Sequence, residues 1–159
     1  MNKRVLIKKI VARLTEELQV YFRAAHASRA EATHEQSKAE SKYDTRGLEA
    51  SYLARGQSKH AVELEAAIAE FEKLGARKFA DGDAIAVGAL VELEHGGESS
   101  IYFLGPRAGG TEVVHENQEV LVITPQSPLG AQLMEKKQGD QPKLNLGGRT
   151  QPARIVSVE

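Results

Sequence analysis

Hydrophobic residues in the first 75 positions recur at alternating spacings of four and three. This heptad spacing is typical of a helix that packs along one seam against a partner helix. The first seam consists of Ile7, Val11, Leu14, Leu18, Tyr21, Ala25, Ser28 and Ala32. The second seam consists of Leu53, Gln57, His60, Leu64, Ala67, Phe71 and Leu74. No proline precedes Pro106, so we predict an antiparallel coiled-coil hairpin over residues 1–76, with Gly75 ending its second helix.

The stretch SKYDTRGLEASYLARGQ (residues 41–57) separates the two seams and lacks their period. We expect it to form the tip of the hairpin, with Gly47 breaking or bending the helix there. A first helix from about residue 4 to 40 would be roughly 55 Å long, so the tip would lie well away from the second domain. The remaining tip candidates are Tyr43, Asp44, Arg46, Glu49 and Tyr52.

Charges of alternating sign run through this tip, and the simplest interpretation is a solvated helix face with ion pairs between neighbouring turns. A functional interpretation is that Asp44 and Glu49 are delivered into the cavity of a partner. Carboxylates are hard oxygen ligands that suit Mg²⁺, and they could complete a second metal site at a phosphodiester centre. On a continuous helix the two would lie about 140° apart around the axis, so they would converge only if the chain bends between them.

After Gly75 the hydrophobic period changes from helical to alternating. Residues 89–94, 100–105 and 119–124 are predicted strands, and residues 143–146 and 153–158 are predicted to close the sheet as a hairpin. Residues 127–137 are predicted to be a short helix, with Ser127 as its N-cap and Pro128 at its first position. The fold class is therefore α+β, with an antiparallel sheet and one short helix forming a second domain at residues 82–159.

Composition fits an ordinary globular protein of 159 residues, 41% hydrophobic and 27% charged, with a net charge of -1. The charge is uneven, because residues 1–80 hold 15 Lys and Arg against 11 Asp and Glu, and the remainder holds 6 against 11. There are no cysteines, which excludes disulfides and thiolate sites. No signal peptide or apolar run of membrane-spanning length is present, so we expect a cytoplasmic location.

Signatures of enzymes are scarce in this sequence. No phosphate-binding loop occurs, and the five histidines never form a pair three or four residues apart. Only Tyr102 and Phe103 are aromatic after residue 80, which argues against a deep substrate pocket and against stacking on single-stranded RNA.

The run VITPQSPLGAQLMEKKQGDQ (residues 122–141) closely resembles the C-terminal signature of the Gre-type transcription elongation factors, which promote transcript cleavage. A helical hairpin with an acidic tip, followed by a small α+β domain, is also similar to that family over nearly the whole chain. The resemblance implies an FKBP-like second domain and bacterial RNA polymerase as the partner. It further implies that Ser127, Pro128, Leu129 and Gly130 belong to the polymerase-binding surface at the rim of the secondary channel.

For the tip, the resemblance implies carboxylates that share a Mg²⁺ with the polymerase and promote cleavage of the nascent RNA 3′ end in a backtracked complex. Asp44 matches the first family carboxylate, whereas Gly47 stands at the place of the second. Glu49 is the next carboxylate along the chain, and Tyr52 matches the family tyrosine only after a one-residue insertion. The factor would itself be no enzyme and would bind no cofactor alone, and it would also approach DNA in the transcription complex.

Three other interpretations remain open at this stage. The first is a secondary-channel regulator that modulates or inhibits the polymerase without promoting cleavage. The second is a prolyl isomerase or chaperone, which the FKBP-like fold raises and the missing aromatic pocket disfavours. The third is a homodimeric coiled-coil scaffold, whereas the hairpin interpretation predicts a monomer.

Overall fold

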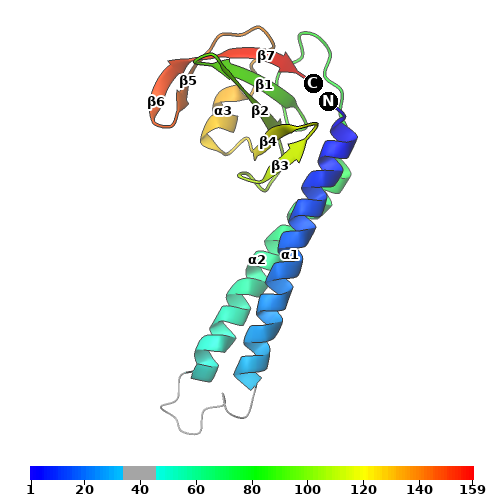
Figure 1. Ribbon diagram of the computed structural model, residues 1–159, viewed down its shortest axis with the longest axis vertical. Coiled ribbons are helices and arrows are strands. Elements are labelled where there is room, and N and C mark those ends of the chain that lie inside the picture. Colours follow the sequence, from blue (N-terminus) through cyan, green and yellow to red (C-terminus); the bar gives the residue numbers. More distant parts are fainter. Residues whose placement is uncertain (34–45) are drawn as a thin grey trace. The chain divides into compact units, whose positions relative to one another are not determined.

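The computed structural model describes the backbone of residues 1–33 and 46–159, and the side chains of residues 1–24, 26–27 and 59–159. Two long helices, α1 (Lys3–Thr33) and α2 (Arg46–Leu74), precede a set of strands and a third helix (Figure 1). The chain forms two compact units. One contains Met1–Ala12 and Ala69–Glu159, and the other contains Arg13–Ile68. No helix among the described residues is long and apolar enough to cross a membrane.

The unit of residues 13–68 is a pair of helical segments lying side by side (Figure 1). Leu14, Leu18, Leu64 and Ala67 of the two predicted seams are all buried, which confirms the heptad pattern where side chains are described. Tyr21 and His60 also face each other, with ring centroids 4.1 Å apart.

The other unit contains a five-stranded sheet in the order β3-β4-β2-β1-β7. Its strands are β1 (Leu90–His95), β2 (Glu98–Leu104), β3 (Glu112–His115), β4 (Gln118–Ile123) and β7 (Arg154–Val158). Helix α3 (Pro128–Leu133) follows β4, and a separate two-stranded ribbon is formed by β5 (Lys143–Leu146) and β6 (Arg149–Pro152). A pair of helices followed by a sheet with one short helix confirms the α+β class.

The sequence pattern predicts a wholly antiparallel sheet, but the sheet is mixed. Strands β2 and β4 are parallel, with Ile101 opposite Val120 and Leu104 opposite Ile123. The reason is β3, a four-residue strand too short to stand out in the hydrophobic pattern. It reverses the chain once more before β4 (Figure 1), so β4 returns in the direction of β2 and pairs directly beside it.

The predicted closing hairpin was wrong in its second strand. Lys143–Leu146 pairs across Gly147 and Gly148 with β6, and β7 pairs instead with β1. Both glycines have positive φ, which permits a tight two-residue hairpin turn. The strand that pairs with Lys143–Leu146 therefore begins immediately after the turn, at Arg149. The more hydrophobic β7 completes the edge of the main sheet.

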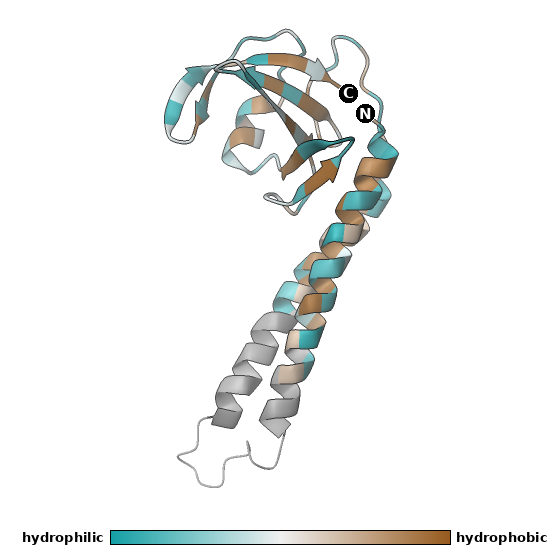
Figure 2. Cartoon of the chain, viewed as in Figure 1, coloured by the Kyte–Doolittle hydropathy of each residue, from teal (hydrophilic) through white to brown (hydrophobic). Residues whose placement is uncertain are grey.

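Both faces of the main sheet pack against apolar side chains, and Figure 2 shows hydrophobic stretches along its strands. On one face Leu93, Leu104, Ile123 and Ile155 form a buried cluster with Leu133 of α3. On the other face the ring centroids of Phe103 and Phe71 of α2 lie 6.2 Å apart. Residues 1–12 and 69–74 therefore belong to the same compact unit as the sheet, while the domain limits 1–76 and 82–159 stay a prediction.

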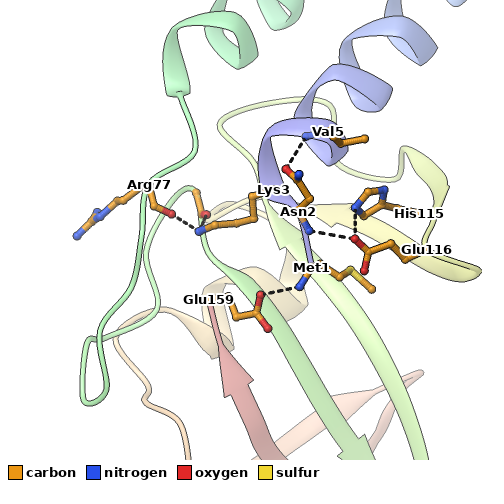
Figure 3. A network of polar contacts seen from close by, with 9 residues as sticks. Met1, Asn2, Lys3, Val5, Arg77, His115, Glu116 and Glu159 are labelled. Carbon is orange, nitrogen blue, oxygen red and sulfur yellow. Dashed lines mark hydrogen bonds and ion pairs between the residues drawn. The ribbon is translucent and has the colours of Figure 1, made fainter.

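The start of α1 is fixed to this unit by polar contacts (Figure 3). The Asn2 side chain accepts a hydrogen bond from the Val5 amide at 3.2 Å, and the Asn2 amide donates to Glu116 Oε1 at 3.1 Å. Lys3 is buried, 8% exposed. Its Nζ donates to the carbonyl oxygens of Arg77 and Gly88 and lies 4.8 Å from the centroid of the Phe79 ring.

Burial lowers the pKa of Lys3 from its ordinary value of 10.5. The positive charge of Arg77 lowers this pKa further, whereas the negative charge of Glu159 raises it and so offsets part of the decrease. The unfolded chain thus keeps this proton up to a higher pH than the folded chain. Because the unfolded state binds more protons between the lowered pKa and 10.5, stability gains a contribution as pH rises through that interval.

We expect Lys3→Met to destabilise the protein by about 1–2 kcal/mol, because two carbonyl oxygens lose a buried donor. The difference in the free energy of unfolding between Lys3→Met and the wild type should widen between pH 8 and pH 10. Only the wild type has the Lys3 amine, so only the wild type becomes more stable as that amine loses its proton. Denaturant unfolding at both pH values measures this, with the exposed Lys8→Met as the matched control. A constant difference at the two pH values would contradict the assignment.

Candidate functional site

Ser127 organises the turn that leads into α3, as the sequence predicts. It is the N-cap of this helix, with φ -70° and ψ 151°, and its Oγ accepts the Gly130 amide at 3.2 Å. The same Oγ accepts the Thr124 amide at 3.1 Å and donates to the Thr124 carbonyl at 2.7 Å. The Ser127 amide donates to Thr124 Oγ1 at 3.2 Å. The Ser127 amide also lies 3.0 Å from the Thr124 carbonyl oxygen, to which it donates. Thr124 and Ser127 are therefore joined by four contacts.

These bonds define what the Ser127 hydroxyl can do chemically. Its donor goes to a backbone carbonyl and its lone pairs go to two backbone amides, so no general base activates it. A nucleophilic serine requires such a base within hydrogen-bond reach. Ser127 is therefore a structural cap, in agreement with the interpretation made from the sequence.

Gly130 is a buried residue of α3, and its amide binds Ser127 Oγ. A Cβ at this position would lie 1.8 Å from the Thr124 carbonyl oxygen and 2.8 Å from Ser127 Oγ. Only a residue without a side chain permits this approach of two backbone segments. The glycine of the Ser-Pro-Leu-Gly motif is thus required by packing.

Pro128 and Leu129 complete the motif in different ways. Pro128 occupies the first position of α3 and is exposed. Leu129 is half-buried and packs against the core cluster beneath the sheet. The turn therefore presents an apolar pyrrolidine ring to solvent from a backbone fixed by Ser127 and Gly130, which suits a contact surface better than a catalytic centre.

The helix after this motif is shorter than predicted. It ends at Leu133 instead of continuing to residue 137, because Met134 leaves the helical region with φ -52° and ψ 138°. Glu135 then adopts φ +67°. The backbone pairs with the loop before β1 instead, where Ile85 N donates to Lys136 O at 2.7 Å and Glu135 N donates to Ile85 O at 3.0 Å.

The predicted tip residues fall mostly outside the described part of the chain. Tyr43 and Asp44 lie outside the described residues. Arg46, Gly47, Glu49 and Tyr52 belong to α2, which begins at Arg46, and their side chains are outside the description. Gly47 thus lies in the first turn of α2, and the shared Mg²⁺ site of Asp44 and Glu49 stays a prediction. Elsewhere, the described side chains include no group of three or more metal-binding residues.

Two features of the unit that contains the sheet have no signal in the sequence. Lys3 is buried and donates to the carbonyl oxygens of Arg77 and Gly88. Lys9 donates to the Val114 carbonyl at 3.0 Å. Both lysines bind positions more than 70 residues away, so neither contact could be found from local pattern.

Of three comparisons with known proteins, only the one with solved structures gives matches. No protein-family model matches the chain, and no curated protein matches it. Among solved structures, the chain is similar to GreA factor homolog 1 (Gfh1) of Thermus thermophilus, with 22% identity, a TM-score of 0.40 and 94% of each chain covered. It is similar to Gfh1 of Thermus aquaticus, with 24% identity, a TM-score of 0.39, and 95% of this chain and 94% of the other covered. A further structure of the transcription factor Gfh1 gives 23% identity, a TM-score of 0.40 and the same coverage.

Proposed function

We propose that this protein is a Gre-type factor that binds RNA polymerase at its secondary channel and directs its hairpin tip toward the active site. The observation that carries the proposal is the Ser-Pro-Leu-Gly turn. The run that resembles the family's signature folds into a turn fixed by Ser127 and Gly130 and leaves Pro128 exposed. Such a rigid apolar projection is suited to docking on a protein partner.

In this function the protein supplies groups to the polymerase and performs no reaction alone. Asp44, with Glu49 as the second candidate, would hold a Mg²⁺ shared with the polymerase and promote hydrolysis of the backtracked RNA. A carboxylate at that place would fix the metal and orient the attacking water. The protein would act as a monomer in the cytoplasm.

A second candidate is a regulator that occupies the channel and modulates or inhibits the polymerase without promoting cleavage. It is favoured by one observation in the sequence: Gly47 stands where the family has its second carboxylate. With a single carboxylate, the shared metal would be held more weakly. The two candidates share the docking surface and differ only in what the tip does.

Docking is tested first, by measuring binding to core RNA polymerase. We expect Pro128→Glu to weaken binding at least tenfold, since an exposed apolar anchor is replaced by a charge at the centre of the contact. Stability should change by no more than about 0.5 kcal/mol, because the side chain is exposed and an acidic residue is tolerated in the first helical turn.

The matched control is Gln138→Glu, which adds the same charge at another exposed position of this unit. It should bind as the wild type does. If Pro128→Glu and Gln138→Glu bind polymerase equally well, the turn is not the docking surface. If the wild type itself does not bind, the proposed function is wrong.

A further inference from the structure

A groove opens where β2 and β4 cease to pair. The two strands are in register only from Ile101 opposite Val120 to Leu104 opposite Ile123. Before that point the start of β2 pairs only with β1, and the start of β4 pairs only with β3. The space between them has a volume of about 470 Å³.

The strand register places an apolar floor and two carboxylates together in this groove. Tyr102 lies opposite Leu121, and Leu121 lies opposite Glu112 on β3. Side chains two residues apart on a strand share a face, so Glu119 lies on the same face as Leu121. Tyr102 and Leu121 are only partly buried and pack with their inner sides against the core cluster, which leaves their outer sides as the floor.

An exposed apolar residue extends this floor at the edge of the sheet. Val114 lies opposite Glu119, and 59% of its surface is exposed. β3 is the edge strand beyond β4, and Val114 lies on the same face as Glu119 and Leu121 because side chains directly opposite or two residues apart share a face. Lys9 Nζ binds the Val114 carbonyl at the outer backbone edge of β3, whereas the Val114 side chain stays exposed beside the groove. Exposed apolar side chains that extend a groove are characteristic of a surface that receives another chain.

The charged residues that line the groove are all acidic, and Lys9, which is not one of them, binds the Val114 carbonyl at the outer edge of β3. Glu92, Glu112 and Glu119 line it, and none of its lining residues is Lys, Arg or His. Glu92 accepts a hydrogen bond from Ser99 Oγ at 2.6 Å. Glu112 and Glu119 form no ion pair or side-chain hydrogen bond with any other described residue, and both are exposed.

We propose that this groove binds a basic segment of a protein partner. Lysine or arginine side chains of that segment would pair with Glu112 and Glu119, and their aliphatic stems would lie on Tyr102 and Leu121. A nucleic acid is disfavoured because its phosphates would meet three carboxylates. This binding is independent of the polymerase docking proposed for the Ser-Pro-Leu-Gly turn.

The test uses the full chain and a fluorescein-labelled eight-residue peptide of alternating lysine and threonine, followed by fluorescence anisotropy at low salt. We expect saturable binding that Glu112→Gln/Glu119→Gln weakens about fivefold, which corresponds to roughly 1 kcal/mol for two exposed ion pairs. In nitrogen-15 spectra of the wild type, the backbone amide signals of Tyr102 and Leu121 should shift on titration with the peptide.

The control variant is Glu63→Gln/Glu65→Gln, which removes two charges from exposed positions of α2. It should bind the peptide within twofold of the wild type. Absence of saturable binding, equal weakening in both double variants, or shifts confined to residues outside the groove would each overturn the proposal. Displacement of the peptide from the groove by an eight-nucleotide oligouridine would overturn the choice of a basic partner.

Discussion

Gly130→Ala is expected to destabilise the unit that contains the sheet by about 3 kcal/mol or more. The added Cβ would stand 1.8 Å from the Thr124 carbonyl oxygen, well inside van der Waals contact. Backbone on both sides of the clash is held in place, because Thr124 and Ser127 bind each other by four contacts. Relief therefore requires the turn to open, which also removes the cap of α3. A loss of this size lowers the melting temperature by more than about 10 °C.

Gly109→Ala is the matched control for this experiment. A Cβ at Gly109 would meet the side chain of the same Thr124 at an ordinary 3.4 Å, so little change in stability is expected. Thermal unfolding followed by circular dichroism compares the two variants with the wild type. Equal melting temperatures for Gly130→Ala and Gly109→Ala would show that the turn is not the rigid element described above. If the turn opens in Gly130→Ala, this variant should also bind RNA polymerase more weakly than the wild type.

Asp44→Asn is expected to reduce stimulated RNA cleavage on the order of 100-fold while leaving polymerase binding unchanged. The amide keeps the size of the carboxylate but removes the charge that a Mg²⁺ ligand provides. In the proposed function, docking depends on the Ser-Pro-Leu-Gly turn, which belongs to the unit that contains the sheet, so we expect the affinity not to follow the loss of cleavage. A backtracked elongation complex with labelled RNA gives the cleavage rate, and a binding titration gives the affinity.

The control is Glu40→Gln, a carboxylate four residues before Asp44 in the sequence that is not part of the predicted metal site. Unchanged cleavage in Asp44→Asn would remove Asp44 from the mechanism. Two further variants ask which group serves as the second ligand. If Glu49 has that role, Glu49→Gln should also lose cleavage. If no second carboxylate is present, Gly47→Glu should increase cleavage. A wild type that binds polymerase but stimulates no cleavage would favour the regulator instead.

Local rules in the sequence were sufficient for the elements that local interactions determine. Ser127 as N-cap and Pro128 at the first helical position were both confirmed, since capping depends on residues within one turn. The heptad seams predicted the buried Leu14, Leu18, Leu64 and Phe71. Gly75, expected to end α2, has φ +63° directly after the last helical residue.

Features that depend on distant partners could not be predicted in this way. Strand β3 has four residues and is stabilised by pairing with β4, so its own pattern is too short to identify it. The choice of β1 as the partner of β7 depends on which edge of the sheet is free. The groove formed by Tyr102, Leu121, Glu112 and Glu119 requires the parallel register of β2 and β4, which no periodicity in the sequence encodes.

The unit that contains the sheet is assembled from both ends of the described chain, and this affects its folding on the ribosome. Leu6 and Ile10 belong to the same unit as β7, although about 145 residues separate them. At roughly 5–20 residues per second, the first turns of α1 wait on the order of ten seconds before β7 is synthesised. The helical unit of residues 13–68 has no such delay, because all of it is synthesised before the sheet. During synthesis the helical pair should therefore form first, while the apolar positions at the start of α1 remain accessible to chaperones.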